Sequence, residues 1–456
     1  PKCDIEPDLQ KYVEDDSRGG RLTLYNTSNG QATTLTSGKG NSSVSGVSWV
    51  SNDRIIFNTS PTNSSAKSID AYALWGMNID GSKKKKLFTL KQVQGTFASP
   101  RLTSLLPDEP NYVMVAINDR RGSVEDYYRL NIFTGAKRRV AMGPDIDNEE
   151  ALFDVVEKND GTPLAAIGNL GDEWRIWRYY DSEDTWDVHF TSKCQTPTFF
   201  PLSGYEDKWL VSGQDITKSK TFNKDNDKSK LFLYDPDDRS FELLYEDDTY
   251  DVGGPTGGCR TAIGGASIDE KTNELIYVAY YGEKPVRIFF DEDVQATNDM
   301  LEGAFPDQIV RPITWNKDRS KVVVSVSSSN NPGEYYYFDK ENMILTFLWD
   351  RSPWLDRSKL SKMTAIKYTA RDGLEIHGYL TTPVNSDGKN MPMIVHPHGG
   401  PNVRDTYGYD PYVQFLASRG YAVFQPNFRG STGYGAYHYI SANKQFGKDM
   451  QNDITD

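Results

Sequence analysis

Short apolar stretches alternate with polar turns along the first 350 residues. Many of these stretches end in aromatic or aliphatic residues followed at once by Asp or Asn, which favour tight turns by hydrogen bonding to the nearby backbone. These endings recur at intervals of roughly fifty residues, and a period of that size predicts the multi-stranded blades of a β-propeller. The repeated end residues are Asn26, Asn78, Asn131, Asp181, Asp235, Asp291 and Asp339.

The starts of the units support the same interpretation. Six matching openings are present, the clearest being Val47-Ser48-Trp49 and Ile313-Thr314-Trp315, each followed by an alternating strand. Six openings against seven endings predict a seven-bladed β-propeller over residues 1–350, with an incomplete first blade. Because the chain opens at Pro1 and not at Met, we expect its natural beginning to be missing. The sequence therefore leaves a signal peptide, and with it the localisation, undecided.

The periodicity changes after Trp349. Residues 351–363 are predicted to form a linker, and residues 364–456 alternate short strands with helices. Strands at 365–369 and 374–382 flank a turn, and a strand at 393–396 follows a polar loop. This alternation predicts an α/β sheet. So few strands would leave an exposed edge, which indicates that this domain is incomplete.

Two helices are expected in this second part. Asp410 and Pro411 suit the cap and the first position of a helix. Its predicted buried face carries Tyr412, Phe415 and Leu416. The strand after it is predicted to run parallel to the strand at 393–396, because a helix joins them. The other helix starts near residue 449, with the apolar residues at 450 and 454 on one face.

Composition narrows the classes of partner. The 456 residues contain 51 Lys and Arg against 64 Asp and Glu, and this net charge of −13 argues against nucleic-acid binding. No apolar run is long enough for a transmembrane helix, so the sequence predicts no membrane partner. Hydrophobic residues make up 37% of the chain and charged residues 25%, which is typical of globular proteins.

The candidate chemistry lies where the strand at 393–396 ends, in His398-Gly399-Gly400-Pro401. The carboxyl ends of strands in open α/β sheets are common ligand-binding positions. Gly399 and Gly400 would allow positive φ and a close approach of the backbone. From these residues alone, a tight turn that binds no ligand is the favoured interpretation, and only the flanking motifs reverse that order.

Three ordered motifs in this region resemble the prolyl oligopeptidase family, and more narrowly its acylaminoacyl-peptidase and dipeptidyl-peptidase-like branch. They are residues 398–401, the stretch 415–423 and the loop 427–435. Asp372-Gly373 and the strand after it are similar to the strand pair that opens the family's hydrolase domain. The close resemblance covers residues 364–456, and it implies a propeller before an α/β-hydrolase domain.

The resemblance implies a serine peptidase that needs no cofactor and cleaves short peptides, because a propeller restricts access to the site. The backbone of Gly399 and Gly400 would form part of an oxyanion hole. His398, Pro401 and Arg429 are expected to shape the loops. The chain contains no Gly-x-Ser-x-Gly, so the Ser-Asp-His triad is expected beyond Asp456, and residues 1–456 alone are expected to be inactive.

The sequence does not favour other roles for these residues. His396 and His398 have no acidic or thiol partner nearby in sequence, so no metal site is expected. His398 as catalytic base would break the chain order Ser, Asp, His of this fold. Ser431 follows Arg429-Gly430, outside any Gly-x-Ser-x-Gly and after the wrong strand, so it is not expected to be the nucleophile.

Two other functions stay open at this stage. One is a propeller that acts as an interaction module beside an inert hydrolase remnant, and the other is an esterase of the same fold. The sequence does not decide between dipeptidyl, acylaminoacyl and prolyl cleavage. It also leaves open whether the protein forms oligomers.

Overall fold

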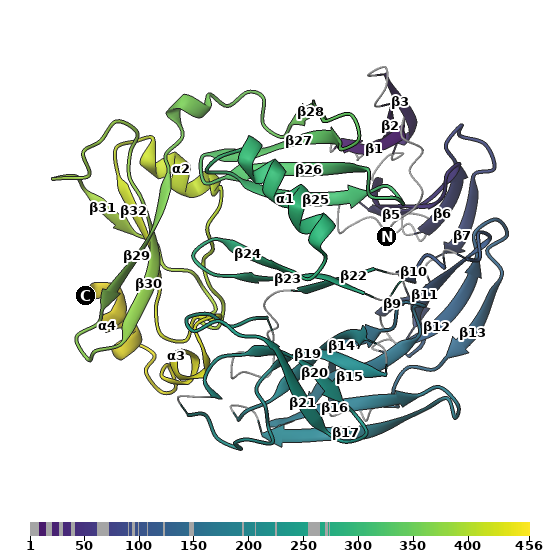
Figure 1. Ribbon diagram of the computed structural model, residues 1–456, viewed down its shortest axis with the longest axis horizontal. Coiled ribbons are helices and arrows are strands. Elements are labelled where there is room, and N and C mark those ends of the chain that lie inside the picture. The colour runs from purple at the N-terminus through teal and green to yellow at the C-terminus, as the bar shows by residue number, and fades with distance from the viewer. Residues whose placement is uncertain are drawn as a thin grey trace.

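A computed structural model shows the arrangement of the chain (Figure 1). It describes residues 9–14, 21–26, 31–37, 42–61, 73–89, 91–93, 96–98, 100–106, 108–121, 124–145, 150–193, 196–205, 207–223, 226–253, 265–269, 272 and 274–456.

Small antiparallel sheets follow one another through the first 350 residues, and in each sheet the strands pair in chain order. The early sheets are β1 (Leu9–Glu14), β2 (Arg21–Asn26) and β3 (Ala32–Ser37); β4 (Ser42–Ser51), β5 (Arg54–Pro61), β6 (Ala73–Asn78) and β7 (Lys85–Thr89); the pair β8 (Lys91–Val93) and β9 (Thr96–Ala98); and β10 (Pro100–Ser104), β11 (Tyr112–Arg121), β12 (Val124–Asn131) and β13 (Lys137–Ala141).

The later sheets repeat this arrangement. They are β14 (Glu150–Glu157), β15 (Pro163–Leu170), β16 (Glu173–Tyr180) and β17 (Thr185–Lys193); β18 (Phe199–Tyr205), β19 (Lys208–Gly213), β20 (Lys230–Asp235) and β21 (Ser240–Tyr245); β22 (Gly265–Ile268), β23 (Leu275–Tyr281) and β24 (Pro285–Phe289); and β25 (Ile309–Trp315), β26 (Lys321–Ser328), β27 (Asn331–Asp339) and β28 (Ile344–Asp350).

Neighbouring sheets pack face to face through shared apolar clusters. One cluster joins Leu22 of β2 to Ile55 of β5 and Val115 of β11. Further clusters join β11 and β12 to β15 and β16, then β15 to β19, β19 to β23, and β23 to β26. The sheets from β4–β7 to β22–β24 therefore pack apolar side chains against a neighbour on each side, as blades do in a propeller.

Asn131, Asp235 and Asp339, three of the recurring residues, form the turns that the sequence predicts. The Asn131 side chain accepts hydrogen bonds from the backbone nitrogens of residues 133 and 134, at 3.0 and 2.9 Å. Asp235 accepts in the same way from Asp237 and Asp238, at 2.9 and 3.1 Å. These side chains accept hydrogen bonds from backbone nitrogens in the turn between the third and fourth strands of a sheet. Because each four-stranded sheet of the first 350 residues has one such turn, the Asp or Asn recurs once per sheet.

Asp291 departs from this pattern. Its carboxylate caps helix α1 (Glu292–Ala304) by accepting from the nitrogens of Asp293 and Val294, both at 3.0 Å. The helix takes the position after β24 where a fourth strand would follow, and it buries Val294 and Leu301. The prediction of strands alone was wrong here, because the same cap residue suits a turn and a helix.

The second part of the chain is an α/β sheet in the order β29-β30-β32-β31. A 3₁₀ turn (Arg357–Lys359) precedes it, and β31 and β32 run parallel, which confirms that prediction. None of the helices in the described part of the chain has the length and apolarity that a membrane crossing needs. The elements are β29 (Met363–Thr369), β30 (Glu375–Thr381), β31 (Met393–Val395), α2 (Pro411–Ala417), β32 (Ala422–Asn427), α3 (Ala436–Ile440) and α4 (Asp449–Thr455).

The predicted cap of α2 is confirmed, but its predicted buried face is wrong. The Asp410 carboxylate accepts from the nitrogens of residues 412 and 413, at 2.7 and 3.1 Å. Tyr412 and Phe415 are 55% and 49% exposed, whereas Gln414 is buried. The Gln414 amide donates to the carbonyls of Ser329 and residue 361, both at 2.8 Å. A polar side chain faces inward because it satisfies backbone groups at the junction with the propeller.

Candidate functional site

The diglycine loop leaves the sheet at the carboxyl end of β31. The His396 nitrogen donates to the Phe424 carbonyl at 2.7 Å, which continues the parallel pairing before the chain turns away. Gly399 and Gly400 are both exposed. Gly400 has a φ of +117°, and an added Cβ would lie 2.9 Å from the nitrogen of Asn402. An added Cβ at Gly399 would meet nothing within 4 Å, so only Gly400 needs to be glycine for conformational reasons.

His398 links this loop to the loop after β32. Its ring stacks on Phe428, with centroids 4.7 Å apart. Its Nε2 lies 2.9 Å from the Ser431 hydroxyl, and its Nδ1 lies 2.8 Å from the Gly399 carbonyl. The Ser431 hydroxyl donates to the carbonyl of Phe428 at 2.7 Å. The Gly399 carbonyl can only accept, so Nδ1 carries the proton of the neutral imidazole and Nε2 is an acceptor; the Ser431 hydroxyl therefore has two acceptors within reach, Nε2 and the Phe428 carbonyl.

This Ser–His contact is not a nucleophile–base pair. Ser431 has no exposed surface, so a substrate carbonyl could not reach its oxygen. The geometry agrees with the assignment of Ser431 and His398 to loop shaping, although those roles remain predictions.

Two asparagines add direct hydrogen bonds between the loops. The Asn427 side chain accepts from the Asp405 nitrogen at 2.8 Å and donates to the Asp405 carbonyl at 3.1 Å. The Asn402 side chain donates to the Gly430 carbonyl at 3.0 Å. Burial raises the pKa of Asp405, and the charges of His398 and then His396 oppose that shift. Pro401 follows Gly400 through a cis peptide bond.

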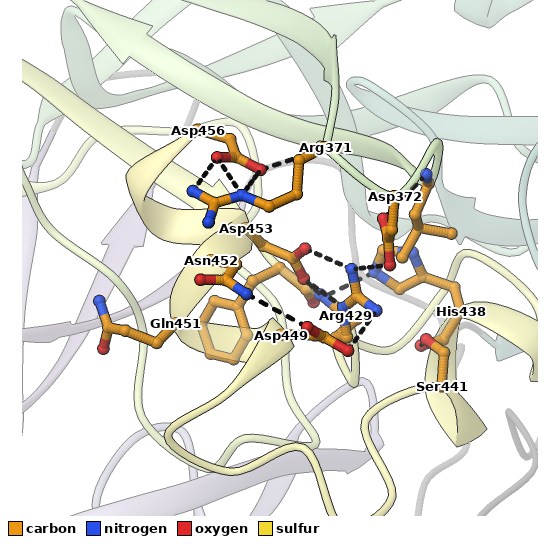
Figure 2. A network of polar contacts seen from close by, with 12 residues as sticks. Arg371, Asp372, Arg429, His438, Ser441, Asp449, Gln451, Asn452, Asp453 and Asp456 are labelled. Atoms are coloured by element: carbon orange, nitrogen blue, oxygen red, sulfur yellow. Dashed lines mark hydrogen bonds and ion pairs between the residues drawn. The ribbon is translucent and has the colours of Figure 1, made fainter.

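Arg429 lies in the loop after β32, and Figure 2 shows it surrounded by carboxylates. Its guanidinium makes two hydrogen bonds to Asp453 of α4, at 2.8 and 2.7 Å, and contacts Asp372 at 2.7 Å. The hydrogen bond to Asp453 raises the pKa of Arg429, and the one from Arg429 lowers the pKa of Asp372. This network joins the loop after β32 to α4 and to the β29–β30 turn. Arg429 and Asp372 lie far apart in the sequence, so the sequence did not predict their contact.

Sequence reasoning missed Asp453. Met450 and Ile454 were expected on one face of α4; Met450 is buried, but Ile454 is only half-buried and Asp453 has no exposed surface. Asp449 and Asp453 lie four residues apart, which places both on one face of the helix, and Asp449 approaches Arg429 at 3.8 Å. That spacing was the available signal for a basic partner.

Arg404 extends the site to the propeller. Its guanidinium donates to the carbonyls of Tyr281 and Gly282 in the β23–β24 turn, at 3.0 and 3.1 Å. It also donates to the Tyr434 hydroxyl at 2.8 Å. Five residues separate Arg404 from His398, so the same loop carries the diglycine turn and the contact with the propeller.

A buried carboxylate of the propeller region holds the end of the second loop. Asp251 has no exposed surface and accepts from the nitrogens of Gly435 and Ser229, at 2.9 and 2.8 Å. Burial raises its pKa to about 6. The Gly435 backbone packs so closely that an added Cβ would lie 2.3 Å from the Asp227 carboxylate. Within the described residues, no group of three or more His, Cys, Asp or Glu is placed to hold a metal ion.

The comparisons with known proteins agree with this architecture. Residues 407–456 match the model of the prolyl oligopeptidase family. The chain is 27% identical over 372 residues to dipeptidyl aminopeptidase BIII of Pseudoxanthomonas mexicana, covering 78% of this chain and 49% of that protein. It is 28% identical over 371 residues to dipeptidyl peptidase family member 6 of Caenorhabditis elegans, covering 75% and 47%.

A solved prolyl endopeptidase superposes with a TM-score of 0.63 at 13% identity, over 98% of this chain and 64% of that one. The fold is thus of the class that combines a propeller with a hydrolase domain. The chain is thus similar in sequence and in fold to members of the prolyl oligopeptidase family. It spans about half the length of the curated relatives described above.

Proposed function

We propose that this protein is a serine-type peptidase that hydrolyses short peptides through an acyl-enzyme. The observation that carries the proposal is the exposed diglycine turn at the carboxyl end of β31. Hydrogen bonds of His398 and Asn402 join the loop that contains this turn to the loop after β32. Acyl transfer places negative charge on the substrate carbonyl oxygen, and fixed backbone N–H donors stabilise that charge. The backbone at Gly399 and Gly400 would supply part of this oxyanion hole.

The surrounding contacts support this role because an oxyanion hole must be rigid before the substrate arrives. His398 and Asn402 fix the loop on either side of the glycines. Arg404 fixes its far end to the propeller. The nucleophile, acid and base of the triad would come from residues outside 1–456, as the family resemblance implies, and the chemistry needs no cofactor.

The propeller would select for short substrates. We propose seven blades over residues 1–350, with the sheet β1–β3 as the incomplete first blade, a linker at 351–363 and the hydrolase part from 364. Because the curated relatives described above are dipeptidyl peptidases by name, dipeptide release is the first specificity to test. Aminoacyl-nitroanilides compared with simple esters would separate a peptidase from an esterase of the same fold.

Replacement of Gly400 by Val tests the loop directly. In the full-length protein, Val at a φ of +117° and with its Cβ 2.9 Å from the Asn402 nitrogen forces the loop to shift. Loss of one oxyanion donor costs about 3 kcal/mol, so we expect kcat to fall by about 100- to 1000-fold. KM for a dipeptidyl-nitroanilide should change little.

Gly399→Ala is the matched control. An alanine Cβ there meets nothing within 4 Å, so its kcat should stay near that of the native protein. A Gly400→Val variant that is folded and turns over at the native rate would remove the loop from the mechanism.

A further inference from the structure

Helix α3 receives its cap from the propeller. The helix has five residues, and Gly435, which precedes it, has no side chain that could accept from its first nitrogens. Instead, the Asp227 carboxylate accepts from the Tyr437 nitrogen at 2.6 Å, and the Asp227 carbonyl accepts from the Ala436 nitrogen at 3.0 Å. Asp227 lies in the connection between β19 and β20, 210 residues before Tyr437. By contrast, α1 and α2 are capped by the residues directly before them.

Further contacts from the propeller hold the start of α3. The Lys228 ammonium donates to the Asp227 carboxylate at 2.6 Å and to the Tyr434 carbonyl at 2.8 Å. The Asp251 nitrogen donates to the Gly433 carbonyl at 3.1 Å. Isolated helices shorter than about 12 residues are marginal in water, so α3 depends on contacts from outside the helix. The propeller therefore fixes the position of α3.

α3 in turn supports the loop after β32. His438 is buried, and its carbonyl accepts from the Gly430 nitrogen at 2.9 Å. Its Nε2 lies 3.1 Å from the Phe428 carbonyl, and because a carbonyl only accepts, Nε2 is the donor. The Phe428 ring stacks on His398, and the Gly430 carbonyl accepts from Asn402. Both contacts of His438 thus end on residues that hold the loop of the diglycine turn.

These contacts form a continuous path from the propeller to the candidate oxyanion hole. We propose that Asp227 is a positioning residue for this site, because its cap on α3 sets the loop after β32 and, through that loop, the diglycine turn. A displacement of about 1 Å at a catalytic group can cost about 100-fold in rate, so a distant cap affects turnover. The proposal rests on the function proposed above for the diglycine turn. It adds that the propeller contributes to transition-state stabilisation as well as limiting access.

Steady-state kinetics of the full-length protein with a dipeptidyl-nitroanilide tests the proposal. Asp227→Ala removes the acceptor for the Tyr437 nitrogen, and we expect kcat to fall about tenfold. KM should stay within about twofold, because hydrogen bonds to the oxyanion act in the transition state and not in substrate binding. A native kcat, or a raised KM with kcat unchanged, would overturn the proposal.

Asp227→Asn separates the cap from the ion pair with Lys228. Asparagine keeps an acceptor and caps helices as well as aspartate does, so kcat should return to within about twofold of the native value. Equal losses in the Asn and Ala variants would assign the effect to the ion pair and contradict the cap.

Asp235→Ala is the matched control. The Asp235 carboxylate also accepts from two backbone nitrogens, but at the other end of β20, away from α3. Asp235→Ala should lower Tm and leave kcat unchanged. A fall in kcat equal to that of Asp227→Ala would make general loss of stability the cause and would refute the positioning role.

A double-mutant cycle with Gly400→Val distinguishes this proposal from the proposed function. If both residues act through the same turn, Asp227→Ala should lower the kcat of the Gly400→Val variant by less than about threefold. A full, additive loss would contradict the path through α3. If Gly400→Val itself keeps the native kcat, the proposed function fails and this proposal fails with it. If Gly400→Val lowers kcat and Asp227→Ala does not, only the role of Asp227 fails.

Hydrogen exchange of the 456-residue chain gives a readout that needs no activity. Asp227→Ala should speed exchange in peptides from residues 427–440 and leave peptides from β14–β17 unchanged. Unchanged exchange at residues 427–431 would show that the cap does not reach the loop after β32, and the proposal would be wrong.

Discussion

The buried ion pair between Arg429 and Asp453 makes a quantitative prediction. Asp453→Asn would leave Arg429, a side chain only 6% exposed, without its main carboxylate partner. Removing one member of a buried pair costs about 3–5 kcal/mol. Arg429 keeps Asp372 and Asp449, whose side chains are 42% and 43% exposed, so we expect a value near the lower limit, about 3 kcal/mol.

The effect should be local, because the pair joins the loop after β32 to α4 (Figure 2). Hydrogen exchange measured by mass spectrometry on peptides from residues 427–456 would report it. A loss of about 3 kcal/mol makes the amides that exchange by local opening about 150-fold faster. Peptides from the sheets β10–β13 and β14–β17 should be unchanged.

Lys367→Met provides the comparison. Lys367 pairs with Glu375 at 3.5 Å on the neighbouring β29–β30 hairpin, where both side chains are about half exposed. Exposed pairs contribute about 0–1 kcal/mol, so exchange should change by less than about sixfold. If Asp453→Asn had no larger effect than Lys367→Met, the pair would not hold α4, and the reasoning from burial would be refuted.

Three further predictions concern the same region. A fluorophosphonate probe should leave the 456-residue chain unlabelled, since Ser431 is buried; a labelled Ser431 peptide would contradict this. Gly435→Ala should lower Tm more than Gly420→Ala. The two glycines have nearly the same φ, +92° and +91°, but only at Gly435 would an added Cβ lie 2.3 Å from the Asp227 carboxylate. Equal decreases in Tm would mean that the positive φ alone, and not this close contact, destabilises the variant. Burial raises the pKa of Asp251 from 3.8 to about 6, so its contribution to folding is complete below about pH 4 and is lost as pH rises through 6. Asp251→Asn should abolish that part of the pH dependence of urea unfolding, and a profile parallel to the native one would contradict the assignment.

Much of the fold could be predicted because its signals are local. The Asn and Asp residues at the strand ends act on nitrogens two or three positions away, as Asn131 does, and Asp410 caps α2 in the same way. The parallel pairing of β31 and β32 followed from the helix between them. Helix α1 could not be predicted, because Asp291 suits both outcomes and the packing of Leu301 in the core beside β25 accompanies the helix.

In the candidate site, too, the features that depend on neighbouring residues could be predicted and the long-range contacts could not. The sequence by itself determined that a diglycine turn follows a strand, that Asp410 begins a helix, and that no Gly-x-Ser-x-Gly is present. Each of these depends on residues only a few positions apart. Only the tertiary structure decided that Gly400, and not Gly399, needs a positive φ, and that Arg429 binds Asp453. It also brought Arg404 to Gly282, 122 residues away, because such contacts depend on how the propeller and the sheet pack.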